Sequence, residues 1–393
     1  MEVLENESLA TLDPQQKAEL IPLQYIETIS DPIKTDQQPG LIFSRENLLV
    51  IKRYVKAVDS LPGASEPISE WIDFVKLGVD GEEVSSFISD LNQHAEGWEP
   101  LERETQALSV KLENFAQTFA TEGALLVSEI RSMHGNSLSD IEDAVLEQLE
   151  TVPLDENERT LKAESILGAI EDIKELIDRM SKDIDQVQTR ADRFYKDVED
   201  TLLPSLAGLD STLDIAGAGE RAAALADNLR VLDQEIEYQS SIISGFTGYT
   251  LFGLTFSPPG VGLTYSLFGD LAKSAKQDKQ KLLERREALV MEMQAFTPQL
   301  ANLATLSGLL NDIKGRLKEV NTAAWNLRYV IRTLSDHTKV SSEELDLLDT
   351  NVSVERFARR IDRVVRPWHK IGNISHELAV IFNDVMNSFN QEN

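Results

Sequence analysis

A heptad repeat of apolar residues runs through much of this sequence and limits the folds that are open to it. In several long segments, apolar side chains recur at alternating spacings of three and four residues. The most regular segment extends from Ile166 to Val198 and stops before Pro204. This spacing places the apolar side chains on one stripe of a helix that packs against other helices. The sequence therefore predicts an all-α protein, an elongated bundle of long coiled-coil helices that forms a rod.

Three further segments carry the same repeat. The first follows Gly97, and its seam is predicted to contain Trp98, Leu101, Thr105, Leu108, Leu112, Phe115, Phe119, Glu122 and Leu126. The next extends from Leu289 to Leu334, where Pro298 is expected to bend the helix without necessarily ending it. The last begins near Phe357. We interpret these seams as helix–helix contacts and not as functional sites, because a heptad stripe is typical of packing.

The stretch from Tyr238 to Gly269 contains no charged residue, although 27% of the chain is charged. Its centre, Ser257-Pro258-Pro259-Gly260, predicts a turn, because paired prolines cannot continue a helix and glycine accepts the backbone angles of a reversal. The stretch is therefore predicted to be a hairpin with two apolar arms. As helices, arms of about 15 and 11 residues would reach roughly 22 and 16 Å, short of the ~30 Å hydrocarbon core of a bilayer. A hairpin of this size would enter one leaflet.

The sequence leaves the conformation of the arms open between helix and strand. The second arm alternates apolar and small polar residues with a strand period, whereas the first arm mixes periods and contains glycines. A buried hairpin in the core of an ordinary globular domain is the alternative interpretation. If the hairpin is the part that meets a membrane, its large apolar side chains are the predicted contacts. These are Ile242, Ile243, Phe246, Tyr249, Leu251, Phe252, Leu254, Phe256, Val261, Leu263, Tyr265, Leu267 and Phe268.

Charged segments of opposite sign flank the hairpin. The segment before it, from Asp227 to Glu237, is net acidic, and the segment after it, from Asp270 to Lys281, is net basic. A fold about the central turn would bring the two together, and their opposite charges favour that pairing. The lysines would also lie where anionic head groups are found, although a solvated charged face is the alternative. The candidate head-group contacts are Lys273, Lys276, Lys279 and Lys281.

Glycines near the hairpin are candidate hinges. A segment of small residues leads from the long regular helix to the hairpin, and further glycines lie in the first apolar arm. Glycine lowers helix stability, so a bend at these positions is plausible, with close helix contact as the alternative role. The candidate hinge residues are Gly208, Gly217, Gly219, Gly245 and Gly248.

Composition excludes several classes of function. The chain has 67 Asp and Glu against 38 Lys and Arg, so a nucleic-acid partner is disfavoured for lack of a matching basic patch. The absence of cysteine excludes a disulfide framework, a zinc–thiolate site and a thiol nucleophile. The five histidines are scattered, and no phosphate-binding loop or nucleophile elbow is present. We therefore expect a non-enzyme without catalytic residues, cofactor or metal.

The predicted organisation has five parts. Residues 1–40, rich in proline, form an extended N-terminal arm, and residues 41–96 form short helices that cap the rod. Residues 97–237 and 270–393 supply the long helices of the rod, and residues 238–269 form the apolar hairpin at one tip. The first residues are acidic and polar, so we expect no Sec-type signal peptide, and any secretion would use another route.

The whole pattern resembles the ClyA-type α-helical pore-forming toxins. Within that group it is most similar to the A subunits of the alpha-xenorhabdolysin binary toxins, the XaxA and YaxA type. The residues that carry this resemblance are the segment Leu41 to Pro62, the HAEGWEPLE step from His94 to Glu102, and the glycine-rich hairpin from Tyr238 to Gly269. The resemblance covers nearly the whole chain, but its motifs are loose patterns without a catalytic signature.

This resemblance implies a secreted cytolysin that is soluble before it reaches a host cell membrane. There the A subunit would bind lipid and activate or stabilise a B subunit, and the heterodimers would assemble into a ring-shaped pore that causes haemolysis. Assignment to A and not to B rests on the resemblance alone. A cytoplasmic coiled-coil scaffold or interaction protein is the main alternative, but it leaves the uncharged insert unexplained. An integral membrane protein is the other, and no segment has the uninterrupted apolar length that it needs.

Overall fold

The computed structural model describes residues 12–30, 45–59, 81–132, 138, 141–146, 148–149, 151–212, 220–253, 262–294, 298–345 and 348–391, with some side chains left out. Within these residues the regular structure is helical, apart from an isolated bridge between Pro153 and Thr350. The predicted all-α class is therefore confirmed. The helices are α2 (Pro14–Ser30), α4 (Arg45–Asp59), α6 (Gly81–Glu96), α7 (Trp98–Ser132), α8 (Asp143–Leu146), α9 (Glu156–Lys196), the π-helix η2 (Asp197–Leu202), α10 (Leu203–Thr212), α11 (Glu220–Gly253), α12 (Gly262–Gln294), α13 (Pro298–Glu344), α14 (Asn351–Val365) and α15 (Trp368–Gln391).

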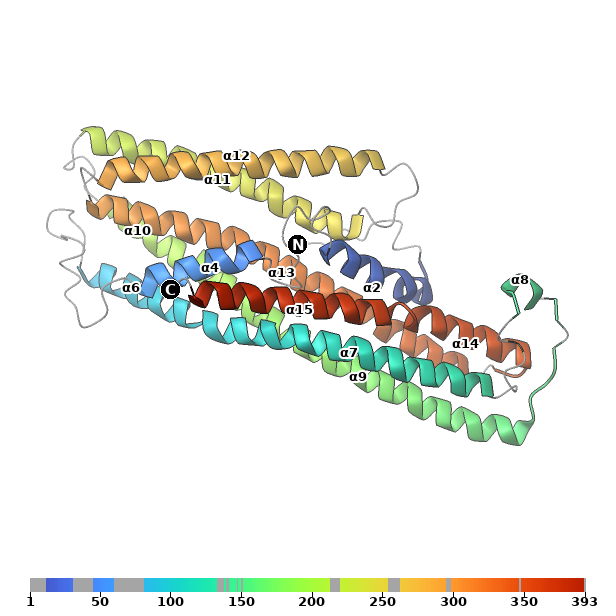
Figure 1. Cartoon of the computed structure of the whole chain (residues 1–393). Coiled ribbons are helices and arrows are strands. Elements are labelled where there is room, and N and C mark those ends of the chain that lie inside the picture. Colours follow the sequence, from blue (N-terminus) through green and yellow to red (C-terminus); the bar gives the residue numbers. More distant parts are fainter. Residues whose placement is uncertain are drawn as a thin grey trace.

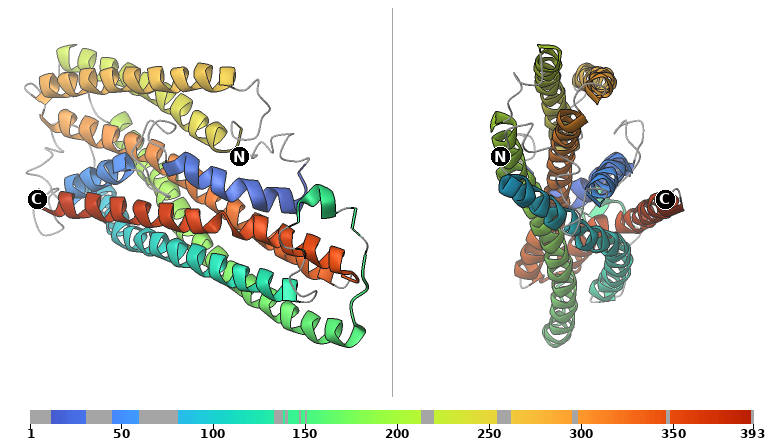
Figure 2. Two further views of the ribbon diagram at one scale, coloured as in Figure 1. Left: turned by 45° about the vertical axis from the view of Figure 1, so that its right-hand side comes forward. Right: turned by 90° about the vertical axis from the view of Figure 1, so that its left-hand side faces the viewer.

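The long helices lie side by side and give the molecule its elongated shape (Figure 1). Helix α7 packs against α9, α14 and α15, while α13 packs against α9 and also contacts the N-terminal helices α2 and α4. Helices α11 and α12 form a separate antiparallel pair that lies along α13. The end-on view in Figure 2 shows this pair together at one edge of the bundle.

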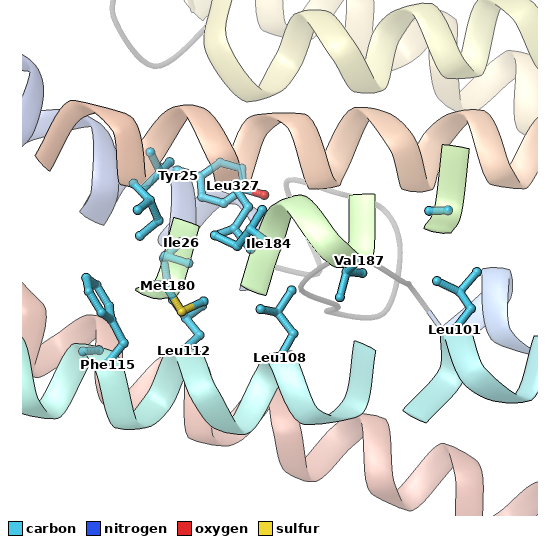
Figure 3. Packing of buried hydrophobic residues seen from close by; sticks show 14 of the residues in the cluster. Tyr25, Ile26, Leu101, Leu108, Leu112, Phe115, Met180, Ile184, Val187 and Leu327 are labelled. Carbon is cyan, nitrogen blue, oxygen red and sulfur yellow. The ribbon is translucent and has the colours of Figure 1, made fainter. Parts of the chain in front are cut away.

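The heptad repeat of α9 forms the centre of the core. Its seam residues Ile166, Ile170, Ile173, Ile177, Met180, Ile184, Val187, Ala191 and Phe194 are all buried, as is Val198 in the π-helix η2 that follows. Figure 3 shows how Met180 and Ile184 lie between Leu108 and Leu112 of α7 and Leu327 of α13. The predicted packing role of this seam is confirmed.

The seam of α7 departs from the predicted register at one position. Glu122 is exposed, and the neighbouring Gly123 is buried in its place. A Cβ atom at Gly123 would lie 2.4 Å from a methyl group of Val365, because α14 approaches α7 closely at this level. The prediction for Glu122 was wrong, since the close contact is made by the absence of a side chain, which an apolar pattern does not reveal.

The seam predicted from Leu289 to Leu334 is divided between two helices. Helix α12 ends at Gln294 and α13 begins at Pro298, and the two helices contact one another instead of continuing in line. Proline suits the first position of a helix, because the N–H group that it lacks has no partner there. Pro298 therefore starts α13 and does not bend a longer helix.

Part of the predicted extended arm is helical. Residues 14–30 form α2, and Asp13 and Gln16 exchange side-chain hydrogen bonds with each other's backbone N–H groups at its start. Ile21, Tyr25 and Ile26 are fully buried, and α2 contacts α13, α14 and α15. Ala18, Ile21 and Tyr25 recur at spacings of three and four residues, which puts them on one helical face, so the extended interpretation was wrong for this segment. The rest of the predicted arm, and Trp71 to Leu77 of the predicted cap, lie outside the described residues.

A buried ion-pair network joins α7 and α14 near one end of the rod. The Glu355 side chain has no exposed surface and accepts from Arg131 at 3.3 Å and from Arg359 at 2.9 Å. Arg359 also donates to the carbonyl oxygens of Leu138 and Ile141. One guanidinium therefore ties the segment between α7 and α9 to α14.

Candidate membrane-contacting hairpin

Helices α11 and α12 are the two arms of the predicted hairpin. They pack against one another in antiparallel fashion, and the residues that join them, 254–261, lie outside the described part of the chain (Figure 1). Helix α11 continues to Gly253 and α12 starts at Gly262. The sequence left helix and strand open for the arms, and the described parts of both are helical.

Most of the predicted contact residues fall within these helical parts. Those in the last turns of α11 are Ile242, Ile243, Phe246, Tyr249, Leu251 and Phe252, and those in the first turns of α12 are Leu263, Tyr265, Leu267 and Phe268. Their side chains, like the residues Leu254, Phe256 and Val261, lie outside what the structure describes. Their role in membrane contact remains a prediction. Across the described helices, none combines the length and the apolar character that a membrane span requires.

The charged half of the hairpin is docked on the rod. Leu225, Leu229, Leu232 and Ile236 are buried on α11, and Ala275 and Met293 are buried on α12. Both helices contact α13. Tyr238, where the uncharged stretch begins, is 65% exposed. The base of the hairpin thus has its own packed interface, which holds the apolar stretch beside the rod.

A guanidinium group joins the three helices at this base. Arg286 on α12 donates from Nε to Asp233 on α11 at 2.6 Å, and its Nη2 donates to the second carboxylate oxygen at 3.4 Å. The same Nη2 donates to the backbone carbonyl of Ala304 on α13. A Cβ atom at Gly308 would lie 2.5 Å from Arg286 Nη1, so this glycine makes room for the guanidinium. We call Arg286, Asp233, the Ala304 carbonyl and Gly308 the base clamp.

The candidate head-group lysines differ in their surroundings. Lys279 is buried at 7% exposure and Lys276 is half-buried, so their ammonium groups do not all face solvent in this conformation. Lys281 is exposed and forms an ion pair with Asp278 at 3.3 Å. The side chain of Lys273 is not described. Lys279 would therefore reach a lipid head group only after α12 changes its contacts, and the head-group role of all four lysines remains a prediction.

The structure describes Gly208, Gly245 and Gly248 among the candidate hinge glycines. Gly208 lies within α10, where a Cβ atom would meet nothing within 4 Å, so close packing does not explain this glycine. Gly245 and Gly248 lie within helical turns of α11, and Gly217 and Gly219 lie outside the described residues. The hinge role of all five stays a prediction.

A groove between the two arms was not anticipated from the sequence. It has a volume of about 660 Å³ and is lined by Val231 and Tyr238 of α11 and by Leu282 and Arg285 of α12, among others. Its lining also includes charged side chains, among them Glu235 and Lys281. The sequence signal was weak, because these residues belong to no heptad seam.

The joint between the rod and the short helices contains a buried histidine. His94 Nε2 lies 3.0 Å from the Phe194 carbonyl, which can only accept, so Nε2 carries the proton and Nδ1 accepts from the Tyr54 hydroxyl at 2.8 Å. The imidazole stacks on the Phe194 ring at 3.9 Å. Burial lowers the pKa of His94, and the Phe194 carbonyl and the Asp197 carboxylate oppose that shift. In the described residues no group of three potential metal-binding side chains comes together.

No protein-family model matches the chain, and no curated protein matches it. Among solved structures, several have a similar fold. Soluble SmhA of the tripartite α-pore forming toxin Smh from Serratia marcescens is similar at a TM-score of 0.51, over 96% of this chain and 97% of that chain, with 11% identity. This likeness establishes a shared fold, an elongated bundle of long helices.

Two further solved structures belong to proteins of the type that the sequence resembles. YaxA from Yersinia enterocolitica is 18% identical, with a TM-score of 0.49 over 89% of this chain and 100% of that chain. XaxA from Xenorhabdus nematophila is also 18% identical, with a TM-score of 0.45 over 90% of this chain and 99% of that chain.

Proposed function

We propose that this chain is a component of a binary α-pore-forming cytolysin. It is secreted, binds a host cell membrane through the uncharged end of the α11–α12 hairpin, and assembles with a B subunit into a ring-shaped pore. In this proposal it acts by membrane binding and assembly, not by catalysis, and it needs no cofactor.

The observation that carries the proposal is the combination of an uncharged hairpin with a strongly charged helical rod. Residues 238–269 contain no charge in a chain with a formal net charge of −29. An apolar surface of this size requires either protein or lipid to cover it. The shared fold with SmhA supports a toxin component over a general scaffold.

The short length of the arms supports the need for a partner subunit. In α11 the uncharged helix from Tyr238 to Gly253 has a length of roughly 24 Å, and in α12 the uncharged part from Gly262 to Gly269 has roughly 12 Å, against ~30 Å for the hydrocarbon core. Such arms suit anchoring in one leaflet. A second subunit would then have to line the pore, which agrees with the A-subunit role implied by the sequence resemblance.

The hairpin assignment is tested by liposome flotation. The variants Phe252→Asp and Leu263→Asp should lose binding to phosphatidylcholine–phosphatidylglycerol vesicles, because each places a charge in the proposed lipid contact. Circular dichroism should show unchanged helicity. The matched control is Val110→Asp, which changes an apolar residue that is 43% exposed on the rod helix α7. Binding by both hairpin variants at the level of the parent protein would refute the assignment.

The partner assignment is tested by haemolysis. The chain alone should release little haemoglobin from erythrocytes, and addition of a B subunit of the alpha-xenorhabdolysin type should produce lysis. Strong lysis by the chain alone at low concentration would contradict the auxiliary role. A coiled-coil scaffold would give neither lysis nor vesicle binding.

A further inference from the structure

The base clamp connects three helices through bonds of unequal strength. Between α11 and α12, the Arg286 guanidinium donates two hydrogen bonds to the oppositely charged Asp233 carboxylate, at 2.6 and 3.4 Å, so this contact is also an ion pair. Between α12 and α13, the same guanidinium makes one bond to a neutral carbonyl, that of Ala304. The clamp therefore holds the two arms to each other more strongly than it holds either arm to the rod.

Burial increases this difference. The Arg286 side chain is 8% exposed and the Asp233 side chain is 22% exposed. Separating the arms would leave a buried charge without its partner, which is strongly unfavourable. The Ala304 carbonyl lies within α13, where the helix supplies a backbone donor, so loss of the arginine leaves it with a partner. Separating the hairpin from α13 therefore costs less free energy at the clamp than separating α11 from α12.

An ion pair between the hairpin and the rod is also weak. Lys314 on α13 lies 3.9 Å from Glu237 on α11 and 3.4 Å from Glu199 on η2. The Glu237 side chain is 70% exposed, and ion pairs in solvent contribute little. When α11 leaves, Lys314 keeps Glu199 as its partner.

We propose that the hairpin leaves the rod as a two-helix unit, with the Arg286–Asp233 pair intact and the Arg286–Ala304 bond broken. The base clamp then determines which surfaces separate. Helix α12 separates from α13 at the contact next to Gly308, while α11 and α12 stay together. This inference rests on the proposed membrane function for its purpose, but the order of separation is a property of the protein in water.

Two distances distinguish this motion from separation of the arms. The chain contains no cysteine, so engineered cysteines can carry spin labels without background. Labels at Gln234→Cys and Arg285→Cys, two residues that line the groove between the arms, report the arm-to-arm distance. Labels at Gln234→Cys and Arg328→Cys, an exposed residue of α13, report the hairpin-to-rod distance. Both are measured by pulsed electron spin resonance.

The perturbation is Gly308→Ala, which puts a methyl group within 2.5 Å of the guanidinium and displaces it without removing either charge. The matched control is Gly168→Ala in α9, where a Cβ atom meets nothing within 4 Å. In water, Gly308→Ala should add a population with a longer hairpin-to-rod distance and leave the arm-to-arm distance unchanged. Gly168→Ala should change neither. If Gly308→Ala does not fold, the parent protein is measured in sub-denaturing urea instead, where the hairpin-to-rod distance should lengthen before the arm-to-arm distance does.

A longer arm-to-arm distance, or no change in either distance, would overturn the proposal. The same label pairs are then measured on phosphatidylcholine–phosphatidylglycerol vesicles with the parent sequence. Vesicles that change neither distance, combined with release by Gly308→Ala in water, would refute the membrane function and leave the clamp inference standing.

Discussion

His337 should make the folded protein sensitive to mild acid. This residue lies in α13 and is 6% exposed. Burial lowers the pKa of His337 from its ordinary 6.5 to about 4, with the Arg360 guanidinium adding to the shift and the Asp13 carboxylate opposing it. The folded state therefore requires a neutral imidazole at a pH where the unfolded chain already binds a proton.

The sign and the size of the effect follow from proton linkage. Because the folded pKa is the lower one, stability is complete above pH 6.5 and is lost as the pH falls toward 4. With these two pKa values, the loss is about 2 kcal/mol at pH 5 and approaches a limit of about 3 kcal/mol below pH 4. Other groups titrate in this range too, so the absolute curve of the parent protein does not isolate His337.

The assay is urea unfolding followed by circular dichroism at pH 7.5, 6 and 5, for the parent protein and His337→Gln. The variant should lose less stability between pH 7.5 and pH 5 than the parent, by about 2 kcal/mol. His369→Gln changes an exposed histidine and is the matched control. Parallel curves for the parent and His337→Gln would refute the reasoning, because the difference in slope depends only on the titration of residue 337.

Three further predictions concern the rod. Ile177→Ala should destabilise the protein by about 2–5 kcal/mol in urea unfolding, because its side chain is fully buried, whereas Leu167→Ala on the same helix, where the leucine is 49% exposed, should have a much smaller effect. Gly123→Ala should lower the melting temperature, because its Cβ would meet Val365. Gly168→Ala should raise the melting temperature, because alanine is more favourable than glycine in a helix by up to ~1 kcal/mol. Equal shifts of the melting temperature in calorimetry would contradict the packing argument. Glu355→Ala should cost about 3–5 kcal/mol, because it leaves two guanidinium groups without their buried carboxylate, and an unfolding midpoint equal to that of the parent protein would show that solvent reaches them.

The rod was predictable because its information is periodic. Each seam position from Ile166 in α9 to Val198 in η2 is buried, as a heptad pattern requires. The pattern failed where packing depends on a missing side chain, as at Gly123, and where prolines favoured an extended interpretation, as Pro22 did in α2. Periodicity describes which face of a helix is apolar, but it does not describe how closely a neighbouring helix approaches.

The hairpin was predictable in its position and topology but not in its attachment. The uncharged stretch and its proline turn indicated two antiparallel arms, and opposite charges on the flanks indicated that the arms pair. Asp233 was among those flanking charges, but its partner is Arg286, which lies 53 residues away and beyond the basic segment that the sequence singled out. A guanidinium that packs against a glycine of a third helix cannot be recognised from a local sequence pattern, because Arg286 and Gly308 lie in two different helices and neither residue is unusual there.

The two interfaces of this protein therefore differ in chemistry, and that difference bears on function. The rod core is formed almost entirely by apolar seams, whose burial is the main source of stability in a folded chain. The surface between the hairpin and the rod has apolar contacts too, including Leu225, Leu229 and Met293, but it also includes the buried Arg286, and buried charges contribute less net stability than apolar groups of the same size. Such groups still require specific partners, so they define where the hairpin docks without binding it as firmly as the rod helices bind each other. The proposed membrane function would need this combination, because the hairpin would have to stay covered in water and become free at a membrane.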